Sequence, residues 1–402
     1  MTVGAGGTLL STTGVSIANA LVLQGNTNFA GINNLTFNGN TSLPASPLTI
    51  NVDAPQQTVS LLGNFIVNAG TAITKTGYGT LVLNGSYTGT VTQPTGGALS
   101  LLDDGDGYGT ANTITGPSIV STGSTVLTIG RTGVDYFPYR PLAANKTFIL
   151  PSLDVAGNAL TISNGNGYGI SVTGPTALPT DPQIYNISTA SASNLVQGLT
   201  LAGQVTGVGG IAKQGVGTLV LSNATNSFGG AGKLIDIQAG VVAASSDGAL
   251  GNAANAIRLG SSGVAGSFRA TGTFSTARSI TLNNGTGTAG NIIEVTAGNT
   301  LTLTSPFVGT SGTTQLIKND NGTLVLAAAN PTSWTGSITA ASGSVQVLTG
   351  GVLVNAGTVR IADAGAAARL LISSPSTTVA RRTVAVRLYK SAAASTSRMR
   401  SS

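Results

Sequence analysis

The sequence contains no cysteine and no histidine in 402 residues, and only 7% of its residues are charged. Without these two side chains the chain cannot form Ser-His-Asp or Cys-His catalytic sets, Cys or His zinc sites, or histidine general bases. The absence of disulfides fits a protein that crosses a cell envelope unfolded, and it also fits many cytosolic proteins. Most hydrolase mechanisms are therefore excluded. What remains for an enzyme is a carboxylate pair, or a calcium-assisted Asp with a basic Lys or Arg.

Aromatic residues make up only 4% of the chain, whereas glycine accounts for 57 of the 402 residues and hydrophobic residues for 41%. Abundant Gly, Thr, Ser and Asn leave little material for long helices. The hydrophobic share is still large enough to bury a continuous core, so disorder is not expected. No segment reaches the roughly 18 apolar residues of a membrane-spanning helix. The predicted class is all-β, with no membrane span.

One phrase occurs three times, as "KTGYGTLVLNGSYTG" from Lys75, "KQGVGTLVLSNATNSFGG" from Lys213 and "KNDNGTLVLAAANPTSWTG" from Lys318. Each copy has a lysine, three variable residues, Gly-Thr-Leu-Val-Leu, a polar spacer, an aromatic residue and a closing glycine. The alternation predicts a short strand whose leucines are buried and whose valine faces the other side, and the glycine and spacer predict corners. The leucines expected to face inward are Leu81, Leu83, Leu219, Leu221, Leu324 and Leu326.

Short apolar runs ended by Gly or Asn, such as "ALVLQG" and "SITLNNGTG", recur along the rest of the chain. Neither a blade period of about 40 residues nor a Trp-Asp signature supports a propeller. Short strands in such number indicate stacked coils, in which each coil buries its inner face against its neighbours. The predicted fold is a right-handed parallel β-helix, that is, a β-solenoid with short strands and irregular coil lengths.

The order Lys-x-Gly-x-Gly-Thr-Leu-x-Leu, then an aromatic-Thr-Gly step and an "AGxxxxL" segment, resembles the passenger-associated repeat of bacterial autotransporters. The similarity is fullest over residues 201–361, and the third copy departs from it with Asp320 in place of a glycine. The resemblance implies a β-helical passenger that is extracellular or on the surface of a Gram-negative or related bacterium.

Two departures from that family are visible. Nothing after Arg360 resembles a translocator of about twelve amphipathic strands, and residues 1–17 lack the pattern of a signal peptide. We therefore expect the chain to be a processed or excised portion of a longer exported protein, or a free-standing relative that has lost the barrel.

The positive charge is concentrated at the C-terminal end. From Arg360 onward there are eight Lys and Arg against one acidic residue, and the preceding residues carry ten against eleven. A neutral solenoid offers no basic stripe for nucleic acid, so no nucleic-acid partner is expected. We predict a β-helical rod over residues 1–378 and a basic tail over residues 379–402. The tail is either a solvated or capping terminus, a segment that docks on a neighbouring solenoid, or a binder of an anionic polymer.

Residues 131–151, "RTGVDYFPYRPLAANKTFILP", break the pattern with four aromatic residues and three prolines. They are predicted to form a projecting loop or small lobe. Tyr136, Phe137 and Tyr139 are the candidate interaction residues for a sugar or protein, against the alternative that they pack locally.

Asp103, Asp104 and Asp106 in "LLDDGDGYG" form the one acidic cluster in the sequence. Their oxygens are candidate ligands for Ca²⁺, and no other cofactor is expected. An EF-hand loop, however, would need a carboxylate at its twelfth position, where Thr115 stands. A turn whose Asp side chains cap their own backbone is the favoured interpretation. No residue is assigned a catalytic role.

Three tyrosines stand between two glycines, namely Tyr78, Tyr108 and Tyr168. A solenoid repeats its corners, so we expect these tyrosines to occupy equivalent corners of different coils.

The leading hypothesis is a non-enzymatic extracellular or cell-surface protein that acts as an adhesive or display rod. The alternative is a structural subunit of an extracellular filament or surface layer, and the third is a polysaccharide-acting β-helix enzyme. The expected partners are a cell-surface glycan or protein, or copies of the chain itself. Copies of the chain would associate through coil ends and the C-terminal tail.

Overall fold

A computed structural model describes residues 1–67, 70–85, 87–94, 96–105, 112–132, 143–188, 198–284, 290–309, 314–329, 336–348, 358–361 and 368–372. Within these ranges the regular structure is β-strand, apart from one turn of 3₁₀ helix, η1 (Gly248–Leu250). The strands pair in parallel, coil on coil. The predicted all-β parallel solenoid is confirmed. The chain divides into two compact units, Met1–Arg258 and Leu259–Ser402.

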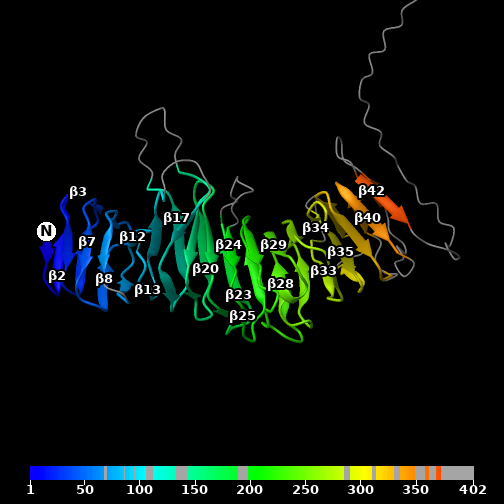
Figure 1. The fold of residues 1–402 in the computed structure, drawn as a ribbon, viewed down its shortest axis with the longest axis horizontal. Helices are drawn as coiled ribbons and strands as arrows, with labels where there is room; N and C mark the ends of the chain where they lie inside the picture. Colours follow the sequence, from blue (N-terminus) through cyan, green and yellow to red (C-terminus); the bar gives the residue numbers. More distant parts are fainter. Residues whose placement is uncertain are drawn as a thin grey trace, which may run out of the picture. The chain divides into compact units, whose positions relative to one another are not determined.

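In the first unit the coils pass through three faces, and most strands pair with a strand of the preceding coil (Figure 1). Face 1 begins with β1 (Thr2–Val3), β4 (Leu21–Leu23), β7 (Thr41–Leu43) and β10 (Phe65–Val67). It continues in a second sheet of β15 (Thr113–Thr115), β18 (Thr147–Leu150), β21 (Gly169–Val172), β24 (Leu199–Leu201), β27 (Thr218–Leu221) and β29 (Gly240–Ala244).

Face 2 contains β2 (Gly7–Leu10), β5 (Thr27–Ala30), β8 (Leu48–Val52), β11 (Ala72–Thr76), β13 (Thr90–Gln93), β16 (Ser118–Ser121) and β19 (Leu153–Asp154), then β22 (Thr176–Ala177) and β25 (Val205–Thr206). Face 3 contains β3 (Val15–Ile17), β6 (Leu35–Phe37), β9 (Thr58–Leu61), β12 (Thr80–Asn84), β14 (Ala98–Leu102), β17 (Thr125–Gly130), β20 (Leu160–Asn164), β23 (Gln183–Ile187), β26 (Ile211–Gln214) and β28 (Leu234–Ile237).

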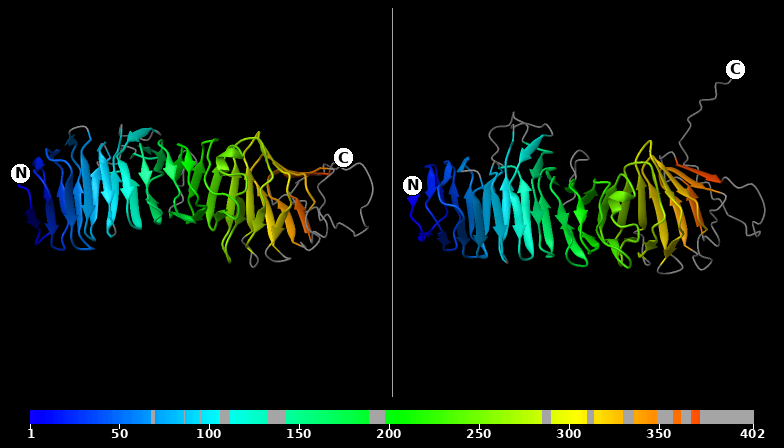
Figure 2. Two further views of the ribbon diagram at one scale, coloured as in Figure 1. Left: turned by 90° about the horizontal axis from the view of Figure 1, so that it is seen from below. Right: turned by 60° about the horizontal axis from the view of Figure 1, so that its bottom comes forward.

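The second unit also has three sets of stacked strands (Figure 2). The first set is β31 (Gly266–Ala270), β34 (Asn291–Val295), β37 (Gln315–Asn319), β39 (Ser337–Ala340) and β41 (Thr358–Ile361). The second is β32 (Phe274–Thr276), β35 (Thr300–Leu303), β38 (Thr323–Leu326), β40 (Gly343–Val347) and β42 (Ala368–Ile372), and the third is β33 (Ile280–Leu282) and β36 (Phe307–Gly309). Strand β30 (Ala256–Leu259) lies at the boundary between the units.

The core follows the predicted alternation. All six leucines of the repeated phrase are at most 3% exposed, so their predicted inward orientation is confirmed. Val82 and Val325 are also buried, at 5% and 6%. One-sided burial was therefore the wrong expectation for the first and third copies of the phrase.

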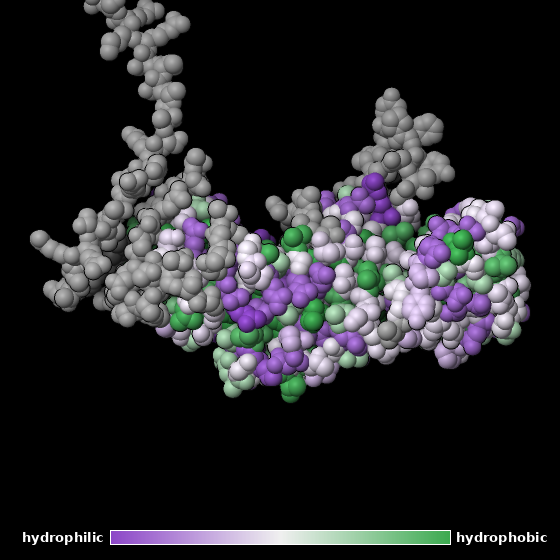
Figure 3. Space-filling model, turned by 180° about the vertical axis from the view of Figure 1, so that it is seen from behind, coloured by the Kyte–Doolittle hydropathy of each residue, from purple (hydrophilic) through white to green (hydrophobic). Residues whose placement is uncertain are grey.

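The surface is mixed. On the face that Figure 3 presents, hydrophilic and hydrophobic residues are interspersed over the described part of the chain. Exposed large apolar side chains such as Leu10, Ile32 and Val126 belong to different coils. Such scattered apolar residues are normal on a protein surface and do not by themselves mark an interface.

The Gly-Tyr-Gly triplets do not share one kind of corner, contrary to expectation. Tyr78 lies between a face-2 strand and a face-3 strand and is 68% exposed, whereas Tyr168 lies between a face-3 strand and a face-1 strand and is fully buried. The Tyr168 hydroxyl donates a hydrogen bond to the backbone oxygen of Asp103 at 2.8 Å. The regular spacing of the triplets along the sequence does not place them at equivalent corners, because the coils differ in length. Tyr108 lies outside the described residues.

The lysine that opens the second copy of the phrase is completely buried. Lys213 Nζ donates hydrogen bonds to the backbone oxygens of Gln214 and Gly215, both at 2.7 Å, and of Ala239 at 3.2 Å. Three acceptors match the three N–H bonds of an ammonium group. Burial lowers the pKa of Lys213 from 10.5 to about 7. Because Ala239 belongs to the following coil, the side chain ties two coils together at one corner.

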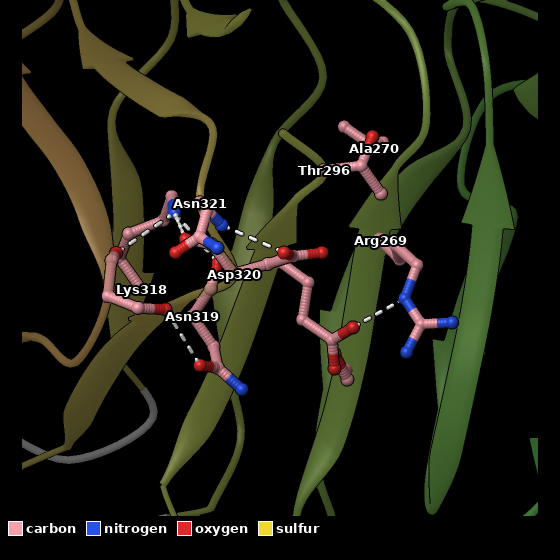
Figure 4. Close-up of polar contacts among 10 residues, drawn as sticks. Arg269, Ala270, Thr296, Lys318, Asn319, Asp320 and Asn321 are labelled. Carbon is pink, nitrogen blue, oxygen red and sulfur yellow. Dashed lines mark hydrogen bonds and ion pairs between the residues drawn. The ribbon is translucent and has the colours of Figure 1, made fainter. Parts of the chain in front are cut away.

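The same arrangement recurs in the second unit at Lys318 (Figure 4). Its Nζ donates to the backbone oxygens of Asn319 and Asp320, both at 2.7 Å, and to that of Ser342 in the next coil at 3.2 Å. Lys75 is buried in the same way in the first copy. Burial lowers the pKa of each of these two lysines to about 8. The phrase is therefore a corner built around a buried lysine.

This corner explains the departure of the third copy. The second residue after the lysine has a left-handed backbone in every copy, with φ of +76° at Gly77, +71° at Gly215 and +68° at Asp320. Among residues other than glycine, Asn and Asp enter this region most readily. Asp320 also accepts a hydrogen bond from the N–H of Asn321 at 2.8 Å. The substitution therefore keeps the geometry of the corner.

The two copies in the first unit occupy different corners. Lys75 lies in β11, before the turn from face 2 to face 3, whereas Lys213 lies in β26, before the turn from face 3 to face 1. The phrase is therefore not tied to one position in the coil.

Replacement of Lys213 by Met should lower the free energy of unfolding by about 1 to 3 kcal/mol, because three half-buried carbonyl groups lose their donor. Urea denaturation of the full chain measures the change. Lys233→Met is the matched control, since the Lys233 side chain is 32% exposed and pairs with Asp181 at 2.7 Å. An exposed pair contributes about 0 to 1 kcal/mol. Equal losses in the two variants would contradict a special role for the buried lysine.

The advantage of the natural chain over Lys213→Met should grow with pH. The folded pKa of about 7 lies below the ordinary 10.5, so between these values the unfolded chain binds more protons than the folded chain. Stability therefore rises with pH in this window, and the Met variant lacks that contribution. Urea curves at about pH 7 and about pH 10 test this difference. Parallel pH profiles for the two chains would mean that the buried lysine keeps its ordinary pKa.

Candidate functional site

The acidic cluster predicted as a calcium site lies only partly within the described residues. Asp103 Oδ1 accepts a hydrogen bond from the N–H of Gly105 at 2.7 Å, and Asp104 Oδ1 accepts one from the N–H of Thr132 at 3.0 Å. Burial raises the pKa of Asp103. Asp106 is not among the described residues, and these contain no group of three or more His, Cys, Asp or Glu placed to hold a metal ion. A calcium site that includes Asp106 stays a prediction.

The candidate interaction residues Tyr136, Phe137 and Tyr139 lie outside the described residues, as do tail residues 379–402. Their predicted roles stay predictions. Within the predicted loop of residues 131–151, residues 147–150 form β18 of face 1. A projecting loop in this range therefore ends before that strand.

Several described carboxylates are held in ion pairs. The pairs are Asp181 with Lys233 at 2.7 Å, Asp236 with Arg258 at 2.5 Å, and Glu294 with Arg269 at 2.5 Å, the last drawn in Figure 4. The hydrogen bond from Lys233 lowers the pKa of Asp181. Each of these three carboxylates is thus paired with a Lys or Arg side chain. Glycoside hydrolysis instead needs two carboxyl groups that flank one substrate bond.

Face 1 of the first unit is interrupted between β10 and β15. On face 2, β13 lies between β11 and β16, and on face 3, β14 lies between β12 and β17. In the described part of this coil, face 1 has no strand, so one sheet ends at β10 and the next begins at β15. Among the described residues, no strand fills the position between the edge of β10 and the edge of β15, and we call this position the vacancy.

The chain crosses face 1 by a short path at this position. Residues 85–89 connect β12 to β13, whereas residues 62–71 make the corresponding connection in the preceding coil. Tyr87 is buried, and its hydroxyl donates to the backbone oxygen of Thr71 at 2.9 Å. Its ring packs edge-on against Phe65, with ring centroids 5.1 Å apart. Tyr87 therefore closes the core behind the vacant strand position.

A groove of about 450 Å³ lies at the vacancy, and we call it the face-1 groove. The residue that precedes β10 and the residues of β15 line it together with residues of the adjoining connections. Its lining consists of Asn64, Asn84, Thr88, Asp103, Gly105, Asn112, Thr113, Ile114 and Thr115. Among these described residues amide and hydroxyl groups predominate, and Asp103 contributes a carboxylate.

The register of β15 fixes which of its backbone groups point into the face-1 groove. The N–H of Thr147 donates to the oxygen of Asn112, and the N–H of Gly116 donates to the oxygen of Ile149, both at 2.9 Å. The backbone groups of the even-numbered residues therefore face β18. Because successive residues direct their N–H and C=O groups to opposite edges, those of Thr113 and Thr115 face the groove.

The same reasoning applies to β10 on the other side. The N–H of Thr41 donates to the oxygen of Asn64 at 2.9 Å, so the backbone groups of Asn64 and Ile66 face β7. Those of Phe65 and Val67 consequently point away from β7, toward the vacant position. Both edges of the groove thus present N–H and C=O groups.

The edge of β25 on face 2 shows how this chain covers a strand edge elsewhere. The N–H of Val205 donates to Oδ1 of Asn226 at 2.7 Å, and the oxygen of Val205 accepts from the N–H of Ser227 at 2.9 Å. No corresponding contact is found for Thr113 and Thr115 among the described residues. Within the described ranges, the backbone groups of Thr113 and Thr115 that face the groove therefore have no partner.

Sequence reasoning missed both the buried lysines and the groove. The fixed place of the lysine in all three copies was the signal for the first. For the second, the signal was the length of the spacer between "TLVLN" and "TVTQ", where five residues stand. A spacer so short leaves little chain for a third strand in that coil.

Over 260 residues the chain is 31% identical to the adhesin BmaC autotransporter of Brucella suis biovar 1 (strain 1330). The similarity covers 60% of this chain and 7% of that much longer protein. The resemblance to an autotransporter passenger is confirmed. No protein-family model and no solved structure matches the chain. Among the residues that the structure describes, none forms a helix long and apolar enough to cross a membrane.

Proposed function

We propose that the chain is a passenger segment of a bacterial cell-surface protein and that it acts by adhesion, without catalysis. The observation that carries the proposal is its similarity to part of an autotransporter adhesin, together with the parallel β-solenoid fold. A solenoid presents an extended side surface, because each coil contacts only its neighbours. Such a surface suits contact with another cell or its matrix.

The chemistry of the chain supports binding over catalysis. The sequence has no histidine or cysteine, and the ion pairs described above neutralise three of its twelve acidic residues. The face-1 groove is lined mainly by Asn and Thr side chains. These groups donate and accept hydrogen bonds but do not exchange protons near neutral pH.

Beads coated with the purified chain should adhere to host-cell monolayers more than control beads do. The control carries Leu221→Asp, because a charge at this fully buried position should unfold the surrounding coils. Bead counts after washing measure adhesion. Equal adhesion of both bead types would contradict the proposal, and filaments seen by electron microscopy without adhesion would favour a structural subunit. Depolymerisation of pectin, alginate or host glycans by the chain would favour an enzyme.

A further inference from the structure

This inference rests on the proposed function, since it names a class of partner for the adhesive surface. We propose that the face-1 groove binds an extended peptide segment of a partner protein, which adds as a strand between β10 and β15.

The width of the vacancy matches one strand. Neighbouring strands lie about 4.8 Å apart, so two strands separated by one vacant position are roughly 10 Å apart. On the other two faces of the same coil, β13 and β14 fill the corresponding position. An extended peptide in the groove would therefore reach both edges at hydrogen-bonding distance.

The hydrogen-bonding groups are those of a sheet edge. Phe65 and Val67 on one side and Thr113 and Thr115 on the other direct backbone N–H and C=O groups toward the vacancy. Open edges of this kind pair readily with an additional strand, and main-chain hydrogen bonds then supply most of the affinity.

Nearby amide side chains are engaged elsewhere. Asn112 Oδ1 accepts a hydrogen bond from Lys146 Nζ at 2.8 Å, and Asn84 Nδ2 donates to the backbone oxygen of Leu62 at 2.7 Å. On the edge of β25, by contrast, the Asn226 side chain takes the place of a neighbouring strand. In the described part of the chain, no side chain covers the edges beside the groove as Asn226 covers the edge of β25.

The floor of the groove restricts the peptide side chains. The buried Tyr87 ring lies behind the vacancy, so we expect no room there for a large side chain of the peptide. Thr88 lines the groove from the short crossing. The side chains that face inward should therefore be small and polar or absent, as in segments rich in Ser, Thr, Asn and Gly. Proline should be excluded, since it lacks the N–H that the edges require.

The test uses a phage-displayed library of linear peptides and a glycan array, each applied to the full chain. Thr113→Pro removes one N–H that points into the groove and leaves the ladder to β18 intact, because that ladder uses Asn112 and Ile114. Thr113→Val is the matched control, since it keeps the N–H and removes only the hydroxyl. Thermal unfolding of both variants checks that they fold.

We expect peptides enriched on the natural chain to bind Thr113→Pro at least about tenfold more weakly and Thr113→Val with little change. On the natural chain, peptide binding should slow hydrogen exchange at the amides of Phe65, Thr113 and Thr115. This second readout decides the question even if the proline variant does not fold.

Three results would overturn the inference. They are the absence of enriched peptides, equal binding by both variants without slowed exchange at these amides, and array glycans whose binding needs the Thr113 hydroxyl. The last result would make the groove a saccharide site. Adhesion of coated beads is measured in parallel, so failure of peptide binding with adhesion intact would leave the proposed function standing.

Discussion

The structure depends on one constraint, which is that a coil of two or three short strands cannot bury its inner face alone. Parallel pairing with the coils before and after supplies the missing neighbours, both for the backbone and for inward side chains such as Leu81 and Leu221. The small residues and turns are needed because the chain must change direction within a few residues at each corner. The buried lysines serve the same corners, because Lys213 and Lys318 donate hydrogen bonds to backbone carbonyl groups there.

A solenoid tolerates a local defect because its contacts are between neighbouring coils. At the short crossing, one coil omits its face-1 strand, yet the core stays closed because the Tyr87 ring packs against Phe65 and its hydroxyl bonds to Thr71. The defect therefore affects the surface more than the interior. In the described part of the first unit it leaves two strand edges and a polar groove on face 1.

The sequence predicted the features that arise from local pattern. Strand, corner and inward leucine could be derived from alternation and glycine, and the departure at Asp320 was visible although its left-handed backbone was not. The burial of Lys75, Lys213 and Lys318 was not predicted, because a lysine is normally exposed. For Lys213 and Lys318 the third acceptor comes from the next coil, and local sequence does not show which coil that is. The groove was missed for a related reason. Which strand lies beside which depends on coil length, and coil length is set by long-range stacking.

The most direct test of this account is residue-resolved hydrogen exchange of β15 in the free chain. If β15 is an open edge, the amides of Thr113 and Thr115 should exchange quickly and that of Ile114, which faces β18, should exchange slowly. The alternation distinguishes an open edge from general fraying, in which all three amides exchange quickly. Slow exchange at all three would mean that the edge is already paired, and it would contradict the vacant strand position on face 1.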